Sequence, residues 1–396
     1  MNNDSLLESK PYQRVQLFSG GGYRFGYYLG SYAALCEYGL KPDLILATCG
    51  GSLASLLVNI APDPEDLKLL IESKAVYNVV KSSRHRQDFT LSAKQRKPSY
   101  FYQGLKRLGL STSASRTLKL HQRETYDELL AELHNFAMFE IADEATWLDE
   151  LIQLQPSLDM NASPDTAIIA SRLVPTEDSL KQTPQAKNLQ LAAKLQEVLF
   201  TPDHLRACID KQTLACPTHR YAPMRIMQAL HLVTDWDIAQ AVRASMADMY
   251  YLQPTFIEGL GWSLGGVIDL TPIELAAQFG NSVFAETKAG YDRVLAAPAI
   301  QRIFGFDPNE RLAEVLSFKA DKNSTNDIEQ NKIHWLPFAD NGKALAGQHA
   351  RKRLNVRQGR IDLIHADYDD FVQQMQAQWH YGHQRTLKYL QANDLA

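Results

Sequence analysis

The first sixty residues switch between short apolar runs and helical spacing. After a polar N-terminal segment, residues 14–18 predict a short strand. The apolar residues of positions 27–38 have the spacing of a helix. Gly39 suits the position just after a helix. Residues 43–48 predict a second, buried strand, and residues 53–60 predict the next helix. This order of strand, glycine turn, helix, strand, turn and helix is typical of a parallel α/β sheet.

The pattern changes in the middle of the chain and returns after residue 235. Residues 124–154 are acidic and amphipathic, which predicts a helix, and residues 166–170 predict a further strand. Residues 174–220 are polar and contain several prolines, which indicates helices joined by loops. The other expected elements are a strand at Val267–Ile268, a helix from Pro272 with Thr271 as its N-cap, a strand at 361–364 and a terminal helix at 368–390.

Composition and charge narrow the class of protein. Of the 396 residues, 45% are hydrophobic and 22% are charged, which excludes a disordered chain. The formal charge of −4 shows no overall basic excess, so we expect no nucleic-acid partner. The four cysteines lack the spacing of a zinc site, and we expect neither a metal nor a cofactor.

One uncharged stretch has nearly the length of a membrane span. Residues 44–61 contain no charge, but they include threonine, glycine, serine and asparagine and would make a poor span. We interpret them as a buried strand followed by a buried helix. The N-terminus lacks the basic start and apolar core of a secretory signal. We therefore expect a soluble, cytoplasmic protein.

A glycine triplet, Gly20-Gly21-Gly22, separates the first predicted strand from the first predicted helix. Such a turn leaves backbone N–H groups free at a helix N-terminus, where they favour a phosphate or an oxyanion that forms during acyl transfer. The phosphate interpretation is weakened because no G-K-[ST] follows and because Phe25 breaks the dinucleotide fingerprint. A tight turn without any ligand is the other interpretation.

The second strand ends in Ala47-Thr48-Cys49-Gly50-Gly51, which suits a nucleophile elbow. At the helix N-terminus the helix dipole would lower the pKa of the Cys49 thiol. The structural alternative is a small cysteine buried in the core. Ser52, three residues further on, offers a rival nucleophile but suits a packing or capping role within the first helical turn.

Taken together, the motifs resemble the patatin-like phospholipase family. The G-G-G-x-R-G loop of that family is similar to residues 20–25, and its G-x-L-x-A-L helix is similar to residues 30–35. Its G-T-S-x-G elbow corresponds to residues 47–51. Its A-S-x-A segment corresponds to residues 244–247, and its D-G-G-x-x-x-N-x-P segment corresponds to residues 264–272.

The resemblance implies a three-layer α/β/α sandwich that hydrolyses lipid acyl esters with a Ser-Asp dyad and no metal. It implies an oxyanion or substrate-binding role for six residues: Gly20, Gly21, Gly22, Arg24, Gly50 and Gly51. We expect residues 10–62 and 160–290 to form the patatin-like core, residues 63–159 a largely helical insertion that is basic and then acidic, and residues 291–396 a C-terminal α/β or helical extension.

Three departures fall on the residues that would carry the reaction. Cys49 occupies the position of the nucleophilic serine, Leu264 occupies that of the dyad aspartate, and Phe25 replaces the last glycine of the loop. A thiol ionises more readily than a serine hydroxyl and needs less help to attack. Hydrolysis of the resulting thioester still requires a base, for which Asp269 or a histidine brought in by the fold are the candidates.

These departures leave two functions from different classes. In the first, the protein is a lipid acyl hydrolase or acyltransferase that uses Cys49 as nucleophile. In the second, it is a catalytically impaired protein that keeps the patatin fold and binds lipid or acyl groups without turnover. The loss of both dyad residues favours binding. Cysteine at the nucleophile position favours catalysis, because random loss would more often leave alanine, glycine or asparagine.

Residues 81–120 form a basic segment with ten Lys or Arg residues against one acid, Asp88. Tyr100, Phe101 and Tyr102 lie among these charges, a combination that suits peripheral contact with an anionic membrane surface. The alternative is a solvated insertion whose charge is neutralised by the acidic residues 124–154.

Overall fold

The computed structural model describes ten stretches of the chain. They are residues 10–85, 126–154, 163–176, 192–210, 215–248, 251–291, 293, 296–318, 332–355 and 360–395. The membrane-contact prediction for residues 81–120 therefore lies almost wholly outside the described residues. Within the described ranges, every helix is too short or too polar to cross a bilayer.

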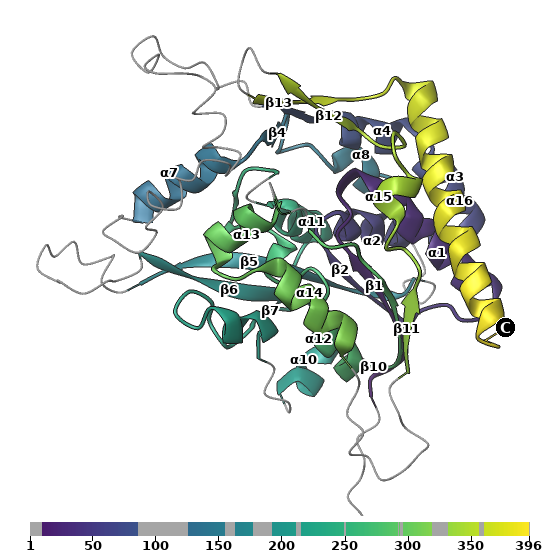
Figure 1. Cartoon of the computed structure of the whole chain (residues 1–396), viewed down its shortest axis with the longest axis horizontal. Helices are drawn as coiled ribbons and strands as arrows, with labels where there is room; N and C mark the ends of the chain where they lie inside the picture. The colour runs from purple at the N-terminus through teal and green to yellow at the C-terminus, as the bar shows by residue number, and fades with distance from the viewer. Residues whose placement is uncertain are drawn as a thin grey trace, which may run out of the picture.

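A mixed sheet forms the centre of the molecule (Figure 1). Its main path runs in the order β11-β10-β1-β2-β5-β6-β7, and β8 and β9 join it through β5. The contacts from β11 to β5 are parallel, β5 and β6 pair antiparallel, and β6 and β7 are parallel. The strands are β1 Tyr12–Ser19, β2 Leu44–Thr48, β5 Asp165–Pro175, β6 Ala193–Phe200, β7 His231–Val233, β8 Thr255–Ile257, β9 Gly261–Ser263, β10 Gly280–Glu286 and β11 Lys332–Leu336.

Helices and two small hairpin-like sheets surround this sheet. The helices are α1 Gly26–Glu37, α2 Gly50–Ile60, α3 Pro64–Ile71, α4 Lys74–Lys81, α7 Tyr126–Phe136, α8 Asp149–Ile152, α10 Asp203–Asp210, α11 Ile238–Met246, α12 Ile273–Phe279, α13 Ala296–Phe304, α14 Pro308–Ser317, α15 Asn341–Ala344 and α16 Tyr368–Ala392. The small sheets pair β3 Ser83–His85 with β4 Phe139–Ile141, and β12 Arg351–Asn355 with β13 Arg360–Ile364.

Alternate residues of the central strands enter two separate hydrophobic cores. On β2, Ile45 and Ala47 join the core that includes residues of α1, α2, α11 and α16. Leu44 and Leu46 join the other core, with residues of α7, α12 and α13. Because successive side chains of a strand point to opposite faces, helices cover both faces of the sheet. This arrangement confirms the expected three-layer α/β/α sandwich.

The elements predicted for the first sixty residues are confirmed. β1, α1 and β2 lie where expected, and Gly39 has the positive φ of 68° that suits the end of α1. α2 begins at Gly50, three residues earlier than predicted, because the chain reverses direction at Cys49 alone. The strand expected at 166–170 is the longer β5, and the terminal helix is α16.

Four predictions in the rest of the chain are wrong in detail. Residues 126–152 are not one helix but α7, β4 and α8. Residues 193–200 form the strand β6, whose polar residues concealed its apolar alternation. Val267–Ile268 lies in a single 3₁₀ turn, η4 Gly266–Asp269, rather than in a strand. The N-cap of α12 is Pro272, not Thr271.

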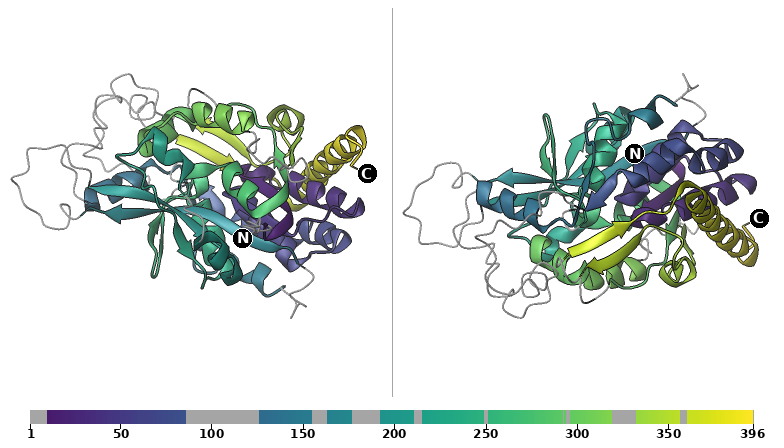
Figure 2. Two further views of the ribbon diagram at one scale, coloured as in Figure 1. Left: turned by 90° about the horizontal axis from the view of Figure 1, so that it is seen from below. Right: turned by 90° about the horizontal axis from the view of Figure 1, so that it is seen from above.

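The C-terminal residues complete the sandwich. β10 pairs with β1, and β11 extends the sheet beyond β10. α16 lies along α1 at one side of the molecule (Figures 1 and 2). Two glycines permit this close approach, since a Cβ at Gly30 would lie 2.0 Å from Trp379 O and one at Gly382 would lie 1.9 Å from Tyr27 O. The extension expected at 291–396 is therefore integrated with the core in its described parts.

Candidate active site

Cys49 has a backbone conformation that few side chains adopt. Its φ of 49° and ψ of −126° place it at the N-cap of α2, directly after β2. A non-glycine residue in such a region costs of the order of 1–3 kcal/mol and persists only where the surrounding structure imposes it. The strand, the single strained residue and the helix have the strand–turn–helix geometry that a nucleophile elbow requires, and we call this turn the elbow. Cys49 keeps part of its surface exposed.

The packing around Gly50 and Gly51 imposes this turn. A Cβ at Gly51 would lie 1.9 Å from Phe18 O in β1, and a Cβ at Gly50 would lie 2.6 Å from Gly22 O. Each position therefore accepts only glycine, because backbone atoms occupy the space. The first turn of α2 is thereby pressed against both the end of β1 and the glycine loop.

The glycine loop lies beside the elbow with its backbone turned to expose amides. Gly20, Gly21 and Gly22 have φ values of 73°, 116° and 56°. Gly20 N–H donates to Thr48 O at 2.9 Å, which ties the loop to β2. Among the hydrogen bonds of the described chain, none uses the N–H of Gly21 or Gly22, and Gly22 N lies 2.8 Å from the point where Gly50 would carry a Cβ. The loop thus offers two amides next to the elbow, the arrangement of an oxyanion hole.

The last turn of α11 anchors the elbow from the other side. Cys49 N–H donates to Ser245 Oγ at 2.8 Å, and the Ser245 hydroxyl donates to Ile169 O at 2.6 Å. A Cβ at Gly266 would lie 3.0 Å from Ser245 Oγ and 3.2 Å from Cys49 N. The A-S-x-A segment and the second glycine of the 264–272 segment therefore meet at the Cys49 amide.

The pKa of the Cys49 thiol is shifted in the direction opposite to the one expected from the sequence. Burial raises the pKa of Cys49 to about 12, and the charge of Asp248 raises it further. The Gly50 amide, Lys288 and Lys352 act in the opposite direction but are outweighed. The helix N-terminus does favour the thiolate, as predicted, but desolvation is the larger effect. At neutral pH the sulfur is a thiol.

Ser52 is a packing residue of the first turn of α2 and does not cap the helix, whose N-cap is Cys49. Its hydroxyl donates to Cys49 O at 2.5 Å, and the side chain is fully buried in the first turn of α2. It therefore supports the elbow and does not face the exposed side of the turn.

Two further residues support the glycine loop. Lys288 Nζ donates to Ser19 O and forms an ion pair with Glu286 Oε1 at 3.0 Å. Glu286 also accepts from the hydroxyls of Tyr27, at 2.7 Å, and Tyr28. A buried charged cluster from β10 and α1 thus holds the end of β1, where the loop begins. No motif in the sequence indicated Lys288 or Glu286, since neither lies in a segment that resembles the family.

Arg24 and Asp269 have other neighbours. Arg24 Nη1 lies 3.2 Å from the point where Gly342, on α15, would carry a Cβ. Asp269 Oδ2 accepts from Arg311 Nη2 at 2.9 Å, and Arg311 also binds both oxygens of Glu274. Within the described residues, no hydrogen bond or ion pair joins Asp269 to Cys49. These contacts make Asp269 the partner of an arginine. They give no support to its role as the acid–base partner of Cys49, which stays a prediction.

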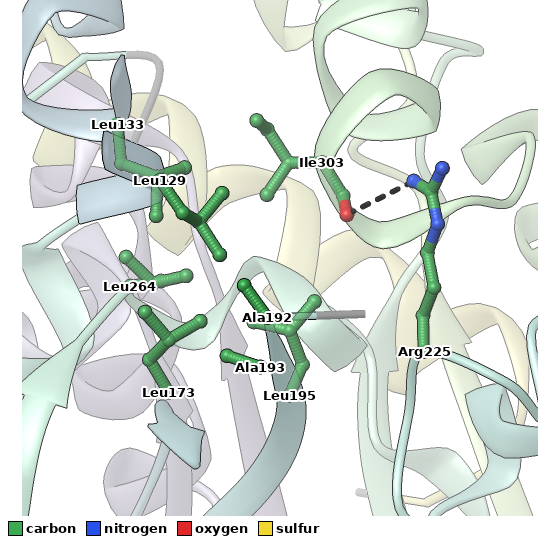
Figure 3. Close-up of a pocket in the computed structure, with 9 residues that line it drawn as sticks. All are labelled: Leu129, Leu133, Leu173, Ala192, Ala193, Leu195, Arg225, Leu264 and Ile303. Atoms are coloured by element: carbon green, nitrogen blue, oxygen red, sulfur yellow. Dashed lines mark hydrogen bonds between the residues drawn. The ribbon is translucent and has the colours of Figure 1, made fainter. Parts of the chain in front are cut away.

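Leu264 belongs to an apolar pocket. It is fully buried and lines this pocket with Leu129, Leu133, Leu173 and Ile303 (Figure 3). Its N–H donates to Ser171 O at 3.0 Å, so the backbone follows β5 while the side chain enters the pocket. Leu264, which the sequence resemblance places at the position of the dyad aspartate, is thus part of a hydrophobic core.

The chain was compared with protein-family models, curated proteins and solved structures. The family model described as patatin-like phospholipase matches residues 17–277, which include the glycine loop, the elbow and the Gly265-Gly266 pair. The crystal structure of VipD from Legionella pneumophila is similar at 12% sequence identity with a TM-score of 0.33, covering 97% of this chain and 67% of VipD. No curated protein matches the chain in sequence. Since the family model spans well over half of the 396 residues, the chain belongs to the patatin-like phospholipase family.

Proposed function

We propose that the protein is a lipid acyl hydrolase or acyltransferase with Cys49 as its nucleophile. The family supports action on lipid acyl esters in general. The observation that carries the finer proposal is the backbone of Cys49, which is held at φ 49° beside two glycine-loop amides that no hydrogen bond among the described residues uses. Strain of this kind concentrates at functional sites, and a cysteine of the core has no need of it.

The reaction follows from this placement. Cys49 Sγ attacks the ester carbonyl, and the amides of Gly21 and Gly22 stabilise the oxyanion that forms. Loss of the alkoxide leaves a thioester on Cys49. In a hydrolase water attacks this thioester, and in a transferase a second alcohol does so; either one takes the acyl group and its proton restores the Cys49 thiol. Because the pKa of the thiol is raised to about 12, attack requires removal of the thiol proton by a neighbouring base.

Covalent labelling tests the proposal. After exposure to a short-chain activated ester, we expect intact-mass analysis to show one acyl group, on Cys49, and the Cys49→Ala variant to show none. Cys36→Ala is the matched control, because Cys36 is also a partly exposed free cysteine and lies on α1. Turnover that survives Cys49→Ala but is lost in Ser52→Ala would contradict the choice of nucleophile.

The second candidate function is binding of lipid or acyl groups without turnover. It is favoured by the hydrocarbon side chain of Leu264 at the dyad position, which cannot accept a proton. A protein of this kind would not be labelled by the activated ester and would not turn it over, yet it would still bind a fatty-acyl probe.

The proposal includes contact of residues 81–120 with an anionic membrane, which rests on their ten basic residues. Co-sedimentation with liposomes is expected only when the vesicles carry anionic lipid. Equal binding to neutral vesicles would contradict it.

A further inference from the structure

The loss of the dyad aspartate leaves the proposed reaction without its usual proton acceptor. Leu264 is a hydrocarbon in an apolar pocket (Figure 3), and Asp269 is the partner of Arg311. The Cys49 thiol still has to lose a proton when it attacks. Another base must therefore come from a different element of the fold.

The backbone of Asp248, which lies two residues after the end of α11, is close to the elbow. Ser245, three residues before it, accepts the hydrogen bond of the Cys49 amide, so this turn is fixed to the elbow. A Cβ at Gly265 would lie 2.7 Å from Asp248 N and 2.9 Å from Asp248 Cα. The backbone of Asp248 therefore lies against the residue that directly follows Leu264, and Gly266 contacts the Cys49 amide. One pair of glycines joins Asp248 to the elbow.

The charged and titratable groups around the sulfur differ in what they can do. Asp248 is 5% exposed, and its charge is the largest influence of any side chain on the pKa of Cys49. The ammonium groups of Lys288 and Lys352 also act on the sulfur, but as cations they cannot accept its proton. The phenols of Tyr23 and Tyr291 interact with it too, and burial raises the pKa of both. Among these groups, Asp248 alone has a carboxyl side chain, which accepts a proton in its ionised form.

We propose that Asp248 is the proton acceptor of Cys49, in place of the aspartate that Leu264 has replaced. This inference rests on the proposed function. As the Sγ–carbonyl carbon bond forms, the thiol proton passes to the Asp248 carboxylate and the carbonyl electrons move to the oxyanion. Collapse of this intermediate breaks the ester C–O bond, and the Asp248 carboxylic acid returns the proton to the departing alkoxide.

The same carboxylate serves the second half of the reaction. A water molecule gives a proton to Asp248 as its oxygen attacks the thioester carbonyl. Collapse then breaks the C–S bond, and the proton returns to the sulfur, which restores the thiol. Each step leaves the charge of the site unchanged, so no further base is required.

Substitution of Asp248 by asparagine is expected to change two rates in opposite directions, the alkylation of Cys49 and the turnover of an ester. Removal of the negative charge makes the thiolate easier to form, so alkylation of Cys49 by iodoacetamide at pH 8 is expected to accelerate by about 3–10-fold. Removal of the base slows turnover of a short-chain activated ester by about 100-fold or more. Alkylation is followed at the Cys49 peptide by mass spectrometry, because the chain has three other cysteines.

Two variants complete the experiment. Asp235→Asn, an exposed aspartate just before α11, is the control and is expected to leave both rates unchanged. Asp248→Glu keeps the charge, so alkylation stays within about twofold of the natural protein while turnover is partly retained. If Asp248→Asn does not fold, this second variant still tests the assignment through its retained turnover.

The outcomes separate this inference from the function on which it rests. Faster alkylation with slower turnover supports Asp248 as the base. Unchanged turnover in Asp248→Asn, or a parallel fall of both rates in a folded variant, overturns the role of Asp248 alone. Absence of acylation in the natural protein overturns the proposed function and, with it, the role of Asp248.

Discussion

The two halves of the site have changed in different ways. The half made by the glycine loop and the elbow is built from backbone, and Gly50 and Gly51 admit no side chain because Gly22 and Phe18 occupy the space. The half made by residues 264–266 has two glycines and, at the position where the family motif carries an aspartate, a buried leucine. In both halves, close contacts between backbone atoms fix the positions of the glycines. The comparison teaches that the backbone of such a site can be kept without the side chain that would react on it.

The largest effect is expected where the backbone half is challenged. Gly51→Ala would place a Cβ 1.9 Å from Phe18 O, a backbone atom that cannot move away. We expect a loss of more than about 4 kcal/mol in the free energy of unfolding, or no folded protein. Thermal or denaturant unfolding measures the change.

The control for this change lies in the neighbouring glycine loop. An alanine Cβ at Gly22 meets no atom within 4 Å, so Gly22→Ala costs only the strain of a positive φ of 56°, about 1 kcal/mol. Equal losses in the two variants would show that the first turn of α2 is not held by its contact with β1.

A smaller effect is expected when the second half is restored. Leu264→Asp returns the family's carboxylate, but the side chain would lie among Leu129, Leu133 and Leu173. We expect a loss of about 3 kcal/mol or more, and no gain in ester hydrolysis. Denaturant unfolding and an activated-ester assay measure the two quantities.

Leu264→Met provides the matched control, because it keeps the volume and the apolar character and should cost less than about 1.5 kcal/mol. A Leu264→Asp variant that is as stable as the natural protein and more active would show that the position still faces the substrate.

The smallest effect concerns the acids near the second half. Burial, and then the charge of Asp269, raises the pKa of Glu197 from 4.5 to about 8. The folded protein therefore holds a proton that the unfolded chain releases, and its contribution to stability is full below about pH 4.5 and is lost as the pH rises through about 8.

We expect the free energy of unfolding to fall as the pH rises from 5 to 8, because the unfolded chain releases this proton at a lower pH than the folded protein does. Glu197→Gln should remove that slope, while the substitution of an exposed acid such as Glu150 should not. A slope that is unchanged in Glu197→Gln would assign it to other groups.

Much of the backbone half of the site could be predicted from the sequence. A glycine triplet after a strand and a small-residue turn before a helix are local signals, and Gly20, Gly21, Gly22 and Cys49 lie together as they predict. The thiol pKa was not predictable in the same way, because its sign depends on burial by residues distant in the chain.

The second half depended on contacts that a linear pattern does not contain. Asp248 directly follows the A-S-x-A segment, and this position in the sequence could have indicated it as a candidate site residue. Its proximity to the elbow, however, arises from packing of its backbone against Gly265. Asp269 was chosen for its distance from Leu264 along the chain, and the fold directs it to Arg311 instead.

The position of β10 limits where the chain can be divided. The family match ends at residue 277, but β10, which begins at Gly280, pairs with β1 in the interior of the sheet. A fragment cut at the family boundary would leave β1 as an open edge with unpaired amides and carbonyls, and would remove both Lys288 and the helix that covers α1. The unit that folds, and that expression trials or domain transplants should preserve, is therefore larger than the unit that the family defines.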